Sequence, residues 1–462
     1  MVDDSKNTIA RIQSSIQIAR SGCKELYDIK LRAIYLERLL GSLRKYSDLI
    51  TSALSDELGR ASYDSYICEL IPLKRCLKYL KRNLRSLTKE RSAKGDWFTF
   101  PAKFSVVQEP YGVVFVHSSW NYPFLLSLEP VAGAVAAGNR VVLQLPVRVP
   151  RCASLVQKII EEVFQTDEVI CVRDELTPAE TVRLGCDYVF YTGSKAGAVD
   201  IMKAAAERAV PGTLELGGKN PCIVDADANL TVAAKKIVWG KFTNSGQTCI
   251  APDYLLVHKS IKSKFLNALS EQIKKMYGEF PLDDSQCGKV VDSFAYERLN
   301  GMSNRGRLVC GGEKDPAEKR ITPTVLDQLE EDDPLLTEEV FGPLIGVVEF
   351  EKTQDILNIL RRNPDPLAVY YFGSGKKTAD ILKRYVRSGS FCINDCLVQF
   401  ANNHVPFGGA GTSGYGSYHG VRTFSTFSRS RTVMRQSRWF DSGFRYKGGK
   451  LKEKLVKFFF NH

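Results

Sequence analysis

Residues 112–143, GVVFVHSSWNYPFLLSLEPVAGAVAAGNRVVL, hold two short β-branched runs on either side of a long stretch of small apolar residues. The runs are Gly112 to Val116 and Arg140 to Leu143, and similar runs follow at Val169 to Val172 and Tyr188 to Tyr191. Short strands that alternate with helical stretches are typical of parallel strands joined by crossover helices. The sequence therefore predicts an α/β fold.

An open α/β sheet binds ligands beyond the carboxyl ends of its strands, at loops that lead into helix N-termini. Three loops fit this description: Ser118 to Pro123, Gln144 to Arg151 and Thr192 to Ala198. Before them, helix-period apolar residues predict a helical layer over residues 8–90. A chain of 462 residues exceeds what one core usually organises, so two or three domains are expected.

Composition and charge argue against several classes of protein. The net charge of +12 is mostly local, because from Arg429 onward ten Lys and Arg face only Asp441 and Glu453, a surplus of +8 that leaves +4 for the rest. A basic surplus confined to a tail does not support nucleic-acid binding. The N-terminus is polar, and the longest apolar stretch, Phe124 to Gly138, is too short to cross a bilayer. A soluble, cytoplasmic protein is expected.

The twelve cysteines are scattered and the five histidines are not paired at metal-ligand spacing, so we expect reduced thiols and no metal site. Cys249 has the best setting for chemistry. The residues before it, Asn244 to Thr248, permit a tight turn that presents the thiol and its own N–H to a cleft. A single cysteine is more often a small buried hydrophobe, so both roles remain open at this stage.

Three further positions could serve such a nucleophile. Glu215 lies in an apolar run, where burial would raise its pKa toward that of a general base, although an exposed strand residue would show the same alternation. Asn121 follows an apolar strand and could donate to an oxyanion, although Asn before an aromatic residue and Pro is also common turn chemistry. Gly193 and Ser194 suggest a phosphate-approach loop, with an ordinary strand-to-helix turn as the alternative.

Taken together, these segments resemble the aldehyde dehydrogenase superfamily in order and spacing, over roughly residues 10–446. The matching segments are Glu109-Pro110-Tyr111-Gly112-Val113, Trp120-Asn121-Tyr122-Pro123, Ala137-Gly138-Asn139, Tyr191-Thr192-Gly193-Ser194, Leu214-Glu215-Leu216-Gly217-Gly218-Lys219, Gly246-Gln247-Thr248-Cys249, Glu338-Glu339-Val340-Phe341-Gly342-Pro343 and Pro406-Phe407-Gly408-Gly409. The closing run from Gly414 to Gly420 is similar to the class 3 branch, which includes fatty aldehyde dehydrogenases.

The resemblance implies NAD(P)-dependent oxidation of an aldehyde, medium- or long-chain aliphatic or aromatic, to the carboxylic acid. Cys249 would attack the aldehyde, Asn121 and the N–H of the cysteine would hold the oxyanion, and Glu215 would activate the water that hydrolyses the thioester. Glu339 would bind the nicotinamide ribose, and Phe341 would contact the nicotinamide side of the cleft. The remaining expected cofactor contacts are Trp120, Gln144, Gly193, Ser194 and Leu216.

The implied architecture has four parts. A Rossmann-like cofactor domain would span residues 1–216, with bridging strands near 94–108, and an α/β catalytic domain would span 217–410. A bridging and oligomerisation segment would follow at 411–440, and a basic tail at 441–462. The resemblance also implies a homodimer.

The adenosine loop departs from the family pattern. Where the family usually has Val-Val-Leu-Lys-Pro-Ser-Glu, this chain has Val142-Leu143-Gln144-Leu145-Pro146-Val147. Gln144 can still bond a hydroxyl, but the acidic residue that repels a 2′-phosphate is absent, and Arg148 or Arg151 could attract one. We therefore expect NADP to be used at least as well as NAD.

The tail and the activity both leave alternatives open. Leu451, Leu455, Phe458 and Phe459 could share a helix face opposite Lys450, Lys454 and Lys457, which suits peripheral contact with an anionic membrane, whereas a solvated tail is the plain alternative. Two other functions fit the same cysteine setting or fold. One is a thioester-forming hydrolase or esterase that binds no dinucleotide, and the other is a catalytically silent binding protein.

Overall fold

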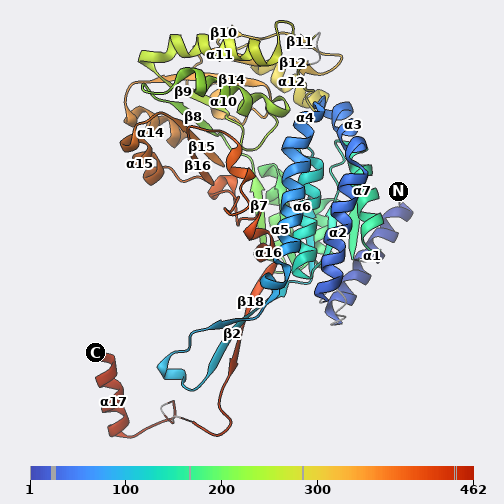
Figure 1. Cartoon of the computed structure of the whole chain (residues 1–462), viewed down its shortest axis with the longest axis vertical. Coiled ribbons are helices and arrows are strands. Elements are labelled where there is room, and N and C mark those ends of the chain that lie inside the picture. The colour runs from blue at the N-terminus through green and yellow to red at the C-terminus, as the bar shows by residue number, and fades with distance from the viewer. Residues whose placement is uncertain are drawn as a thin grey trace.

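The computed structural model describes residues 2–21, 28–165, 168–282, 286–441, 443 and 445–461. Cys23 and His462, which were counted above, lie outside these residues. Two α/β layers and a projecting three-stranded sheet make up the molecule (Figure 1). The α/β fold expected from the sequence is confirmed.

The first sheet has the order β17-β7-β6-β3-β4-β5, and its strands are parallel except for β17. Its members are β3 (Val113–His117), β4 (Arg140–Gln144), β5 (Val169–Val172), β6 (Tyr188–Gly193), β7 (Gly212–Leu216) and β17 (Gly414–Tyr415). The four predicted strands are all present. They form because their β-branched runs are buried on both faces, as crossover helices require.

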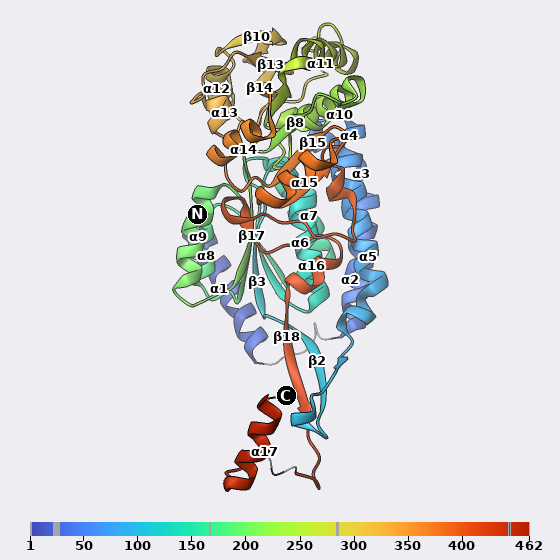
Figure 2. The ribbon, with the colours of Figure 1, turned by 90° about the vertical axis from the view of Figure 1, so that its left-hand side faces the viewer.

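Helices cover both faces of this sheet. Figure 2 shows α1 (Val2–Arg20), α8 (Pro178–Arg183) and α9 (Lys195–Ala206) on one face. The other face carries α6 (Pro123–Ala137) and α7 (Pro150–Val163). The helices predicted over residues 8–90 do not form a single layer, because α1 covers the opposite face of the sheet. The outer helical layer beside α6 and α7 consists of α2 (Ile29–Lys45), α3 (Ser47–Leu58), α4 (Ser62–Ser65), a π-helical turn η2 (Tyr66–Leu70) and α5 (Ile71–Thr88).

The second sheet has the order β10-β13-β14-β9-β8-β15-β16, and only β10 is antiparallel to its neighbour. Its strands are β8 (Pro221–Val224), β9 (Tyr254–His258), β10 (Arg307–Cys310), β13 (Thr324–Asp327), β14 (Leu344–Phe350), β15 (Ala368–Phe372) and β16 (Ser390–Ile393). Its helices are α10 (Leu230–Phe242), α11 (Lys262–Tyr277), α12 (Ser293–Met302), α13 (Pro334–Thr337), α14 (Thr353–Arg362) and α15 (Lys376–Tyr385). A small hairpin joins β11 (Lys314–Asp315) to β12 (Arg320–Ile321).

The third sheet projects away from the other two (Figure 1). It pairs β1 (Arg91–Ala93), β2 (Lys103–Pro110) and β18 (Ser428–Arg435) in antiparallel order. Helix α17 (Lys450–Asn461) lies apart from the two α/β layers (Figure 1). Among the described helices, none combines the length and the apolar character that a membrane span needs.

Helix α6 is the central packing element, because every one of its residues is buried. The short helix α16 (Val421–Thr426) crosses it closely at Gly133. A Cβ on Gly133 would lie 2.4 Å from Cγ2 of Thr423 and 3.0 Å from Cδ2 of Phe427. Glycine is therefore needed here for close approach rather than for backbone freedom.

We expect Gly133→Ala to lower the free energy of unfolding by about 1–3 kcal/mol, because the added methyl overpacks a filled core. Thr423→Ser removes the Cγ2 atom and should recover part of the loss. The matched control is Gly41→Ala in α2, where nothing lies within 4 Å of the new Cβ. The thermal unfolding midpoint is measured for the parent, for Gly133→Ala with and without Thr423→Ser, and for Gly41→Ala. Gly133→Ala with an unchanged midpoint would contradict the packing argument.

Candidate active site

A cavity of about 640 Å³ lies where the carboxyl ends of the first sheet meet the second α/β layer. Every candidate site residue named from the sequence lines it, with the exceptions of Gln144 and Arg151. It thus brings together the thiol of Cys249, the carboxyl of Glu215 and the amide of Asn121, although they lie far apart in the chain.

The loop before Cys249 has an unusual backbone. Asn244, Ser245 and Gly246 have φ values of 55°, 52° and 71°, so three consecutive residues adopt the left-handed conformation. Only glycine fits the last position, because a Cβ on Gly246 would lie 2.2 Å from the carbonyl oxygen of Gly342. The predicted tight turn is therefore present.

The backbone of Cys249 is held in place by the buried side-chain amide of Asn220. Nδ2 of Asn220 donates to the carbonyl oxygens of Cys249 at 2.8 Å and of Ala251 at 3.0 Å. Oδ1 of Asn220 accepts from the N–H of Ala368 at 2.9 Å, which ties the loop to β15. The backbone of Cys249 is thus placed by hydrogen bonds from the second sheet.

Burial, together with the nearby carboxyls of Glu339 and Glu215, raises the pKa of the Cys249 thiol to about 12. The N–H groups of Cys249 and Ile250 act in the opposite direction. Without a ligand, the thiol is therefore protonated at neutral pH. The same N–H groups face the sulfur, where an oxyanion formed on an attached carbon would also lie.

Glu215 lies at the end of β7 with its side chain buried. Neither carboxyl oxygen has a hydrogen-bond partner among the described residues. Burial raises the pKa of this carboxyl well above its usual range, so the neutral form is favoured. A buried carboxyl without partners is costly unless it exchanges protons with a ligand or water.

The side-chain amide of Asn121 is buried and held on one side. Its Nδ2 donates to the carbonyl oxygen of Gln247 at 3.0 Å. An amide nitrogen carries two hydrogens, so one remains for a group in the cavity. Next to it, the hydroxyls of Tyr122 and Thr248 are 2.5 Å apart. These contacts join the loop after β3 to the cysteine loop.

The other end of the cavity has features that suit a dinucleotide. Gly193 and Ser194 precede the first turn of α9, where free N–H groups favour a phosphate. Glu339 accepts from the N–H of Gly218 at 2.9 Å, and burial raises its pKa to about 7. Carboxylate oxygens at this position can accept from ribose hydroxyls.

Two glycines of this region are required by neighbouring side chains. A Cβ on Gly193 would lie 2.5 Å from the hydroxyl of Tyr191, and one on Gly217 would lie 2.1 Å from Oε1 of Glu339. The Tyr191 side chain alone therefore explains why position 193 is glycine, without reference to a ligand in the cavity. The rings of Trp120 and Phe341, which also line the cavity, meet edge to face with their centres 5.6 Å apart.

Gln144 lies elsewhere. It ends β4 in a buried position, and its Nε2 donates to the carbonyl oxygens of Arg173 and, at 3.3 Å, Leu176. Arg148 lines the cavity instead, with its guanidinium 4.8 Å from the ring centre of Trp120 and ion-paired to Asp292.

Much of the remaining wall of the cavity is apolar, and apart from Phe407 and Tyr418 it comes from segments outside the motifs quoted from the sequence. It is contributed by the π-helical turn, by the first turn of α5, by α6, by α10 and by the segments after β16 and β17. The residues are Ile67, Cys68, Pro72, Leu125, Leu126, Trp239, Leu397, Val398, Phe400, Phe407 and Tyr418.

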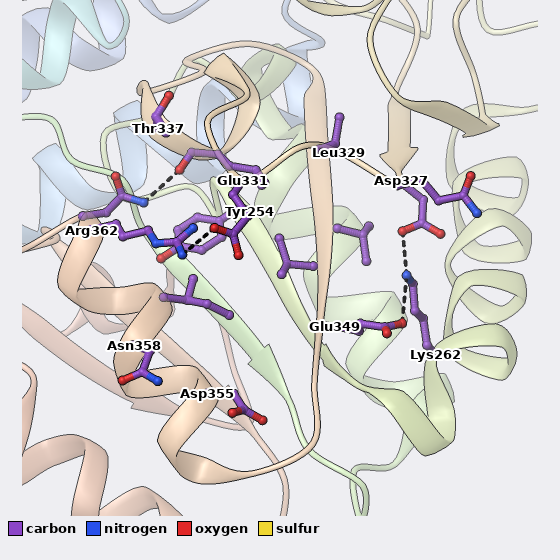
Figure 3. A pocket seen from close by; sticks show the side chains of 16 residues that line it. Tyr254, Lys262, Asp327, Leu329, Glu331, Thr337, Glu349, Asp355, Asn358 and Arg362 are labelled. Atoms are coloured by element: carbon purple, nitrogen blue, oxygen red, sulfur yellow. Dashed lines mark hydrogen bonds and ion pairs between the residues drawn. The ribbon is translucent and has the colours of Figure 1, made fainter.

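A second cavity, of about 650 Å³, lies between α14 and the face of the second sheet (Figure 3). Tyr254 lies within it, and its rim carries the ion pairs of Lys262 with Asp327 and of Arg362 with Glu331. Its described lining includes no cysteine or histidine. Cys249 lines the cavity of about 640 Å³ and not this second cavity.

Comparison with known proteins agrees with this geometry. The model of the aldehyde dehydrogenase family matches residues 4–433. The chain is 35% identical to the 4,4'-diaponeurosporen-aldehyde dehydrogenase of Staphylococcus aureus, over 94% of this chain and 95% of that protein. It is 36% identical to aldehyde dehydrogenase family 3 member H1 of Arabidopsis thaliana, over 90% and 87% of the two chains. The family 3 likeness expected from the closing glycine-rich run is thereby confirmed.

A solved structure of Staphylococcus aureus AldH in a substrate-bound state superposes on this chain with a TM-score of 0.93 and 33% identity. It covers 100% of this chain and 99% of that one. The family match, the full-length relatives and the shared fold lead to one conclusion: this chain belongs to the aldehyde dehydrogenase family, whose members oxidise aldehydes to carboxylic acids.

Proposed function

We propose that Cys249 is the nucleophile, Asn121 the oxyanion donor and Glu215 the general base of this aldehyde dehydrogenase. We also propose that its substrates are medium- or long-chain aliphatic or aromatic aldehydes. The observation that carries the assignment is the meeting of a thiol, an amide with a free hydrogen and a partnerless carboxyl in one cavity. The apolar wall of that cavity supports an apolar aldehyde.

The residues divide the reaction into two stages. The Cys249 thiol first gives up its proton to solvent, and Sγ then attacks the aldehyde carbon as a thiolate, while Nδ2 of Asn121 and the N–H of Cys249 hold the oxyanion of the thiohemiacetal. A bound nicotinamide would supply the acceptor for the hydride of this carbon. Glu215 then takes a proton from a water molecule, which attacks the thioester carbonyl and releases the acid together with the thiolate.

The state of Glu215 fits this role. Its raised pKa keeps the carboxyl neutral in the ligand-free site, and only the ionised form can accept a proton. The rate of thioester hydrolysis should therefore rise with pH as this carboxyl ionises. The carboxyl also raises the pKa of the Cys249 thiol, which shows that the two groups interact electrostatically.

Absorbance of the reduced nicotinamide, followed with a medium-chain aldehyde and NAD or NADP, tests these roles. Cys249→Ala should produce no reduced cofactor. Glu215→Gln should still form the thioester and give a burst of about one equivalent of reduced cofactor per active site. Its steady turnover should then be roughly a hundred- to ten-thousandfold slower than that of the parent, because base catalysis of thioester hydrolysis is lost. In this variant the rise of the steady rate with pH should disappear.

Glu161→Gln, a change at an exposed carboxyl of α7, is the matched control and should behave as the parent. Steady turnover of Glu215→Gln at the parental rate would remove Glu215 from the role of general base. Reduced cofactor from Cys249→Ala would remove Cys249 from the role of nucleophile.

We further propose that NADP is used at least as well as NAD. Val147 carries no charge to repel a 2′-phosphate, and Arg148 lines the cavity. Arg151, the other candidate, is ion-paired to Asp56 and does not contribute to the cavity wall. The structure thus favours Arg148 over Arg151 as the phosphate contact.

Steady-state kinetics with both cofactors tests this proposal. Arg148→Ala should raise KM for NADP about tenfold and change KM for NAD much less, because one charged hydrogen bond to the phosphate is lost. Arg151→Ala is the control and should leave both values unchanged. A clear preference of the parent enzyme for NAD would contradict the proposal.

The projecting sheet of β1, β2 and β18 supports the proposed homodimer, because an antiparallel sheet held away from its own core offers open edges and faces for a second copy. We propose the division at residues 216, 410 and 440 as the domain boundaries. We also propose a cytoplasmic location, with the tail in contact with a membrane surface.

The geometry of α17 supports the membrane contact. Its apolar residues Leu451, Leu455, Phe458 and Phe459 are exposed, and one of them, Phe459, contacts the exposed ring of Trp97 at 5.2 Å. An exposed helix with aromatic residues and lysines suits the surface of an anionic bilayer.

Changing Lys450, Lys454 and Lys457 together to Gln should weaken association with phosphatidylserine vesicles by roughly tenfold to a hundredfold, because each lysine near such a surface contributes attraction. Vesicle cosedimentation measures the effect, and it should weaken with added salt. The control changes three lysines of α15 to Gln and so removes the same amount of charge from another helix; these are Lys376, Lys377 and Lys383. Unchanged association of the tail variant would leave the solvated tail as the better description.

A further inference from the structure

A buried ion pair links the outer helical layer to the active site. Arg60 follows α3, Glu69 lies in the π-helical turn η2, and both are almost fully buried. Nη1 of Arg60 contacts Oε1 of Glu69. Oε2 of Glu69 accepts from the N–H groups of Phe124 at 2.8 Å and Leu125 at 3.0 Å, in the first turn of α6.

The rest of the Arg60 guanidinium bonds to the catalytic loops. Its Nη2 donates to the carbonyl oxygen of Asn121 at 2.5 Å, and its Nε and Nη2 donate to Oδ1 of Asn244 at 3.1 Å and 2.7 Å. These partners come from the loop after β3 and from the left-handed turn before Cys249. One planar cation therefore holds both loops.

The two loops are then joined to each other. Nδ2 of Asn244 donates to the carbonyl oxygens of Asn121 at 3.0 Å and Gln247 at 3.2 Å. Nδ2 of Asn121 donates to the same carbonyl of Gln247 at 3.0 Å. The network closes on Gln247, two residues before Cys249, and it sets the orientation of the Asn121 amide.

A buried ion pair by itself contributes little to stability, because desolvation offsets the attraction. The contacts of Arg60 serve another purpose. We propose that Arg60 and Glu69 are positioning residues, which hold the oxyanion amide of Asn121 in register with the cysteine loop. This inference rests on the proposed role of Asn121. Arg60 fixes the Asn121 backbone, and Glu69 neutralises Arg60 and anchors it to α6.

A purely structural role for the pair would make a different prediction. Loss of the pair would then lower stability and leave the contribution of Asn121 to the rate unchanged. With a positioning role, the benefit of Asn121 depends on Arg60, so the two losses overlap. A double-mutant cycle on kcat separates the two cases.

The variant Arg60→Met with Glu69→Leu replaces the pair by apolar side chains, an exchange that often preserves a fold. Its kcat should fall roughly tenfold to a hundredfold, with KM for the aldehyde within about threefold, because small misplacements are costly in the reacting complex. Asn121→Ala alone should lower kcat about a hundred- to a thousandfold. Added to the paired variant, Asn121→Ala should cost no more than about tenfold.

Arg32→Met is the matched control, because Arg32 is a buried arginine of the same layer that donates to the carbonyl oxygen of Ala136 at 3.1 Å, away from the cavity. It should lower the unfolding midpoint and leave kcat within about threefold. Circular dichroism establishes the fold of each variant. If the paired variant does not fold, Arg60→Lys enters the same cycle, because it keeps the charge and loses the planar donor set.

If Asn121→Ala lowers kcat by the same factor in the paired variant as in the parent, the positioning role is overturned and the proposed function is left intact. Parental kcat in a folded Arg60 variant would do the same. Parental kcat in Asn121→Ala alone would instead overturn the oxyanion role of Asn121, and this inference with it.

Discussion

The close contact between Gly246 and the carbonyl of Gly342 is the constraint on which the active site depends. It presses the left-handed turn before Cys249 against the segment that carries Glu339 and Phe341. Backbone in this conformation persists only where its surroundings hold it. Gln247 provides part of that support, because its amide donates to the carbonyl oxygen of Lys289 at 2.9 Å and accepts from the N–H of Val291 at 3.0 Å.

Electrostatics in the cavity follow from the same close packing. The carboxyls of Glu215 and Glu339 and the thiol of Cys249 share a buried space, so burial raises the pKa of all three groups. Burial therefore shifts each group toward its neutral form. Behind Glu339, Asp253 accepts from the N–H of Val340 and pairs with Lys219, which fixes the segment that carries Glu339.

Gln144 and Gly193 show where local reasoning stops. Gln144 ends a correctly predicted strand, yet its Nε2 donates to carbonyl oxygens of a neighbouring loop and the residue does not line the cavity. Gly193 lies at the predicted helix N-terminus, but the hydroxyl of Tyr191 already excludes a side chain there. The local pattern specifies neither the loop that Gln144 contacts nor the way the Tyr191 side chain turns toward Gly193. The same holds for Arg60 and Glu69, which lie in a helical layer without any catalytic motif.

The sequence alone determined the α/β class, the strands from Val113 to Tyr191 and the identity of Cys249, Glu215 and Asn121 as candidates. It could do so because strand and helix periodicity, and the short motifs around these residues, are encoded by neighbours in the chain. Only the tertiary structure decided which residues share the cavity, that Arg148 lines it while Gln144 does not, and that Arg60 joins its loops. Those facts depend on burial and on contacts between separate segments of the chain, which no local pattern specifies. Gln144 and Arg173 are 29 residues apart, and Asn121 and Gln247 are 126 apart.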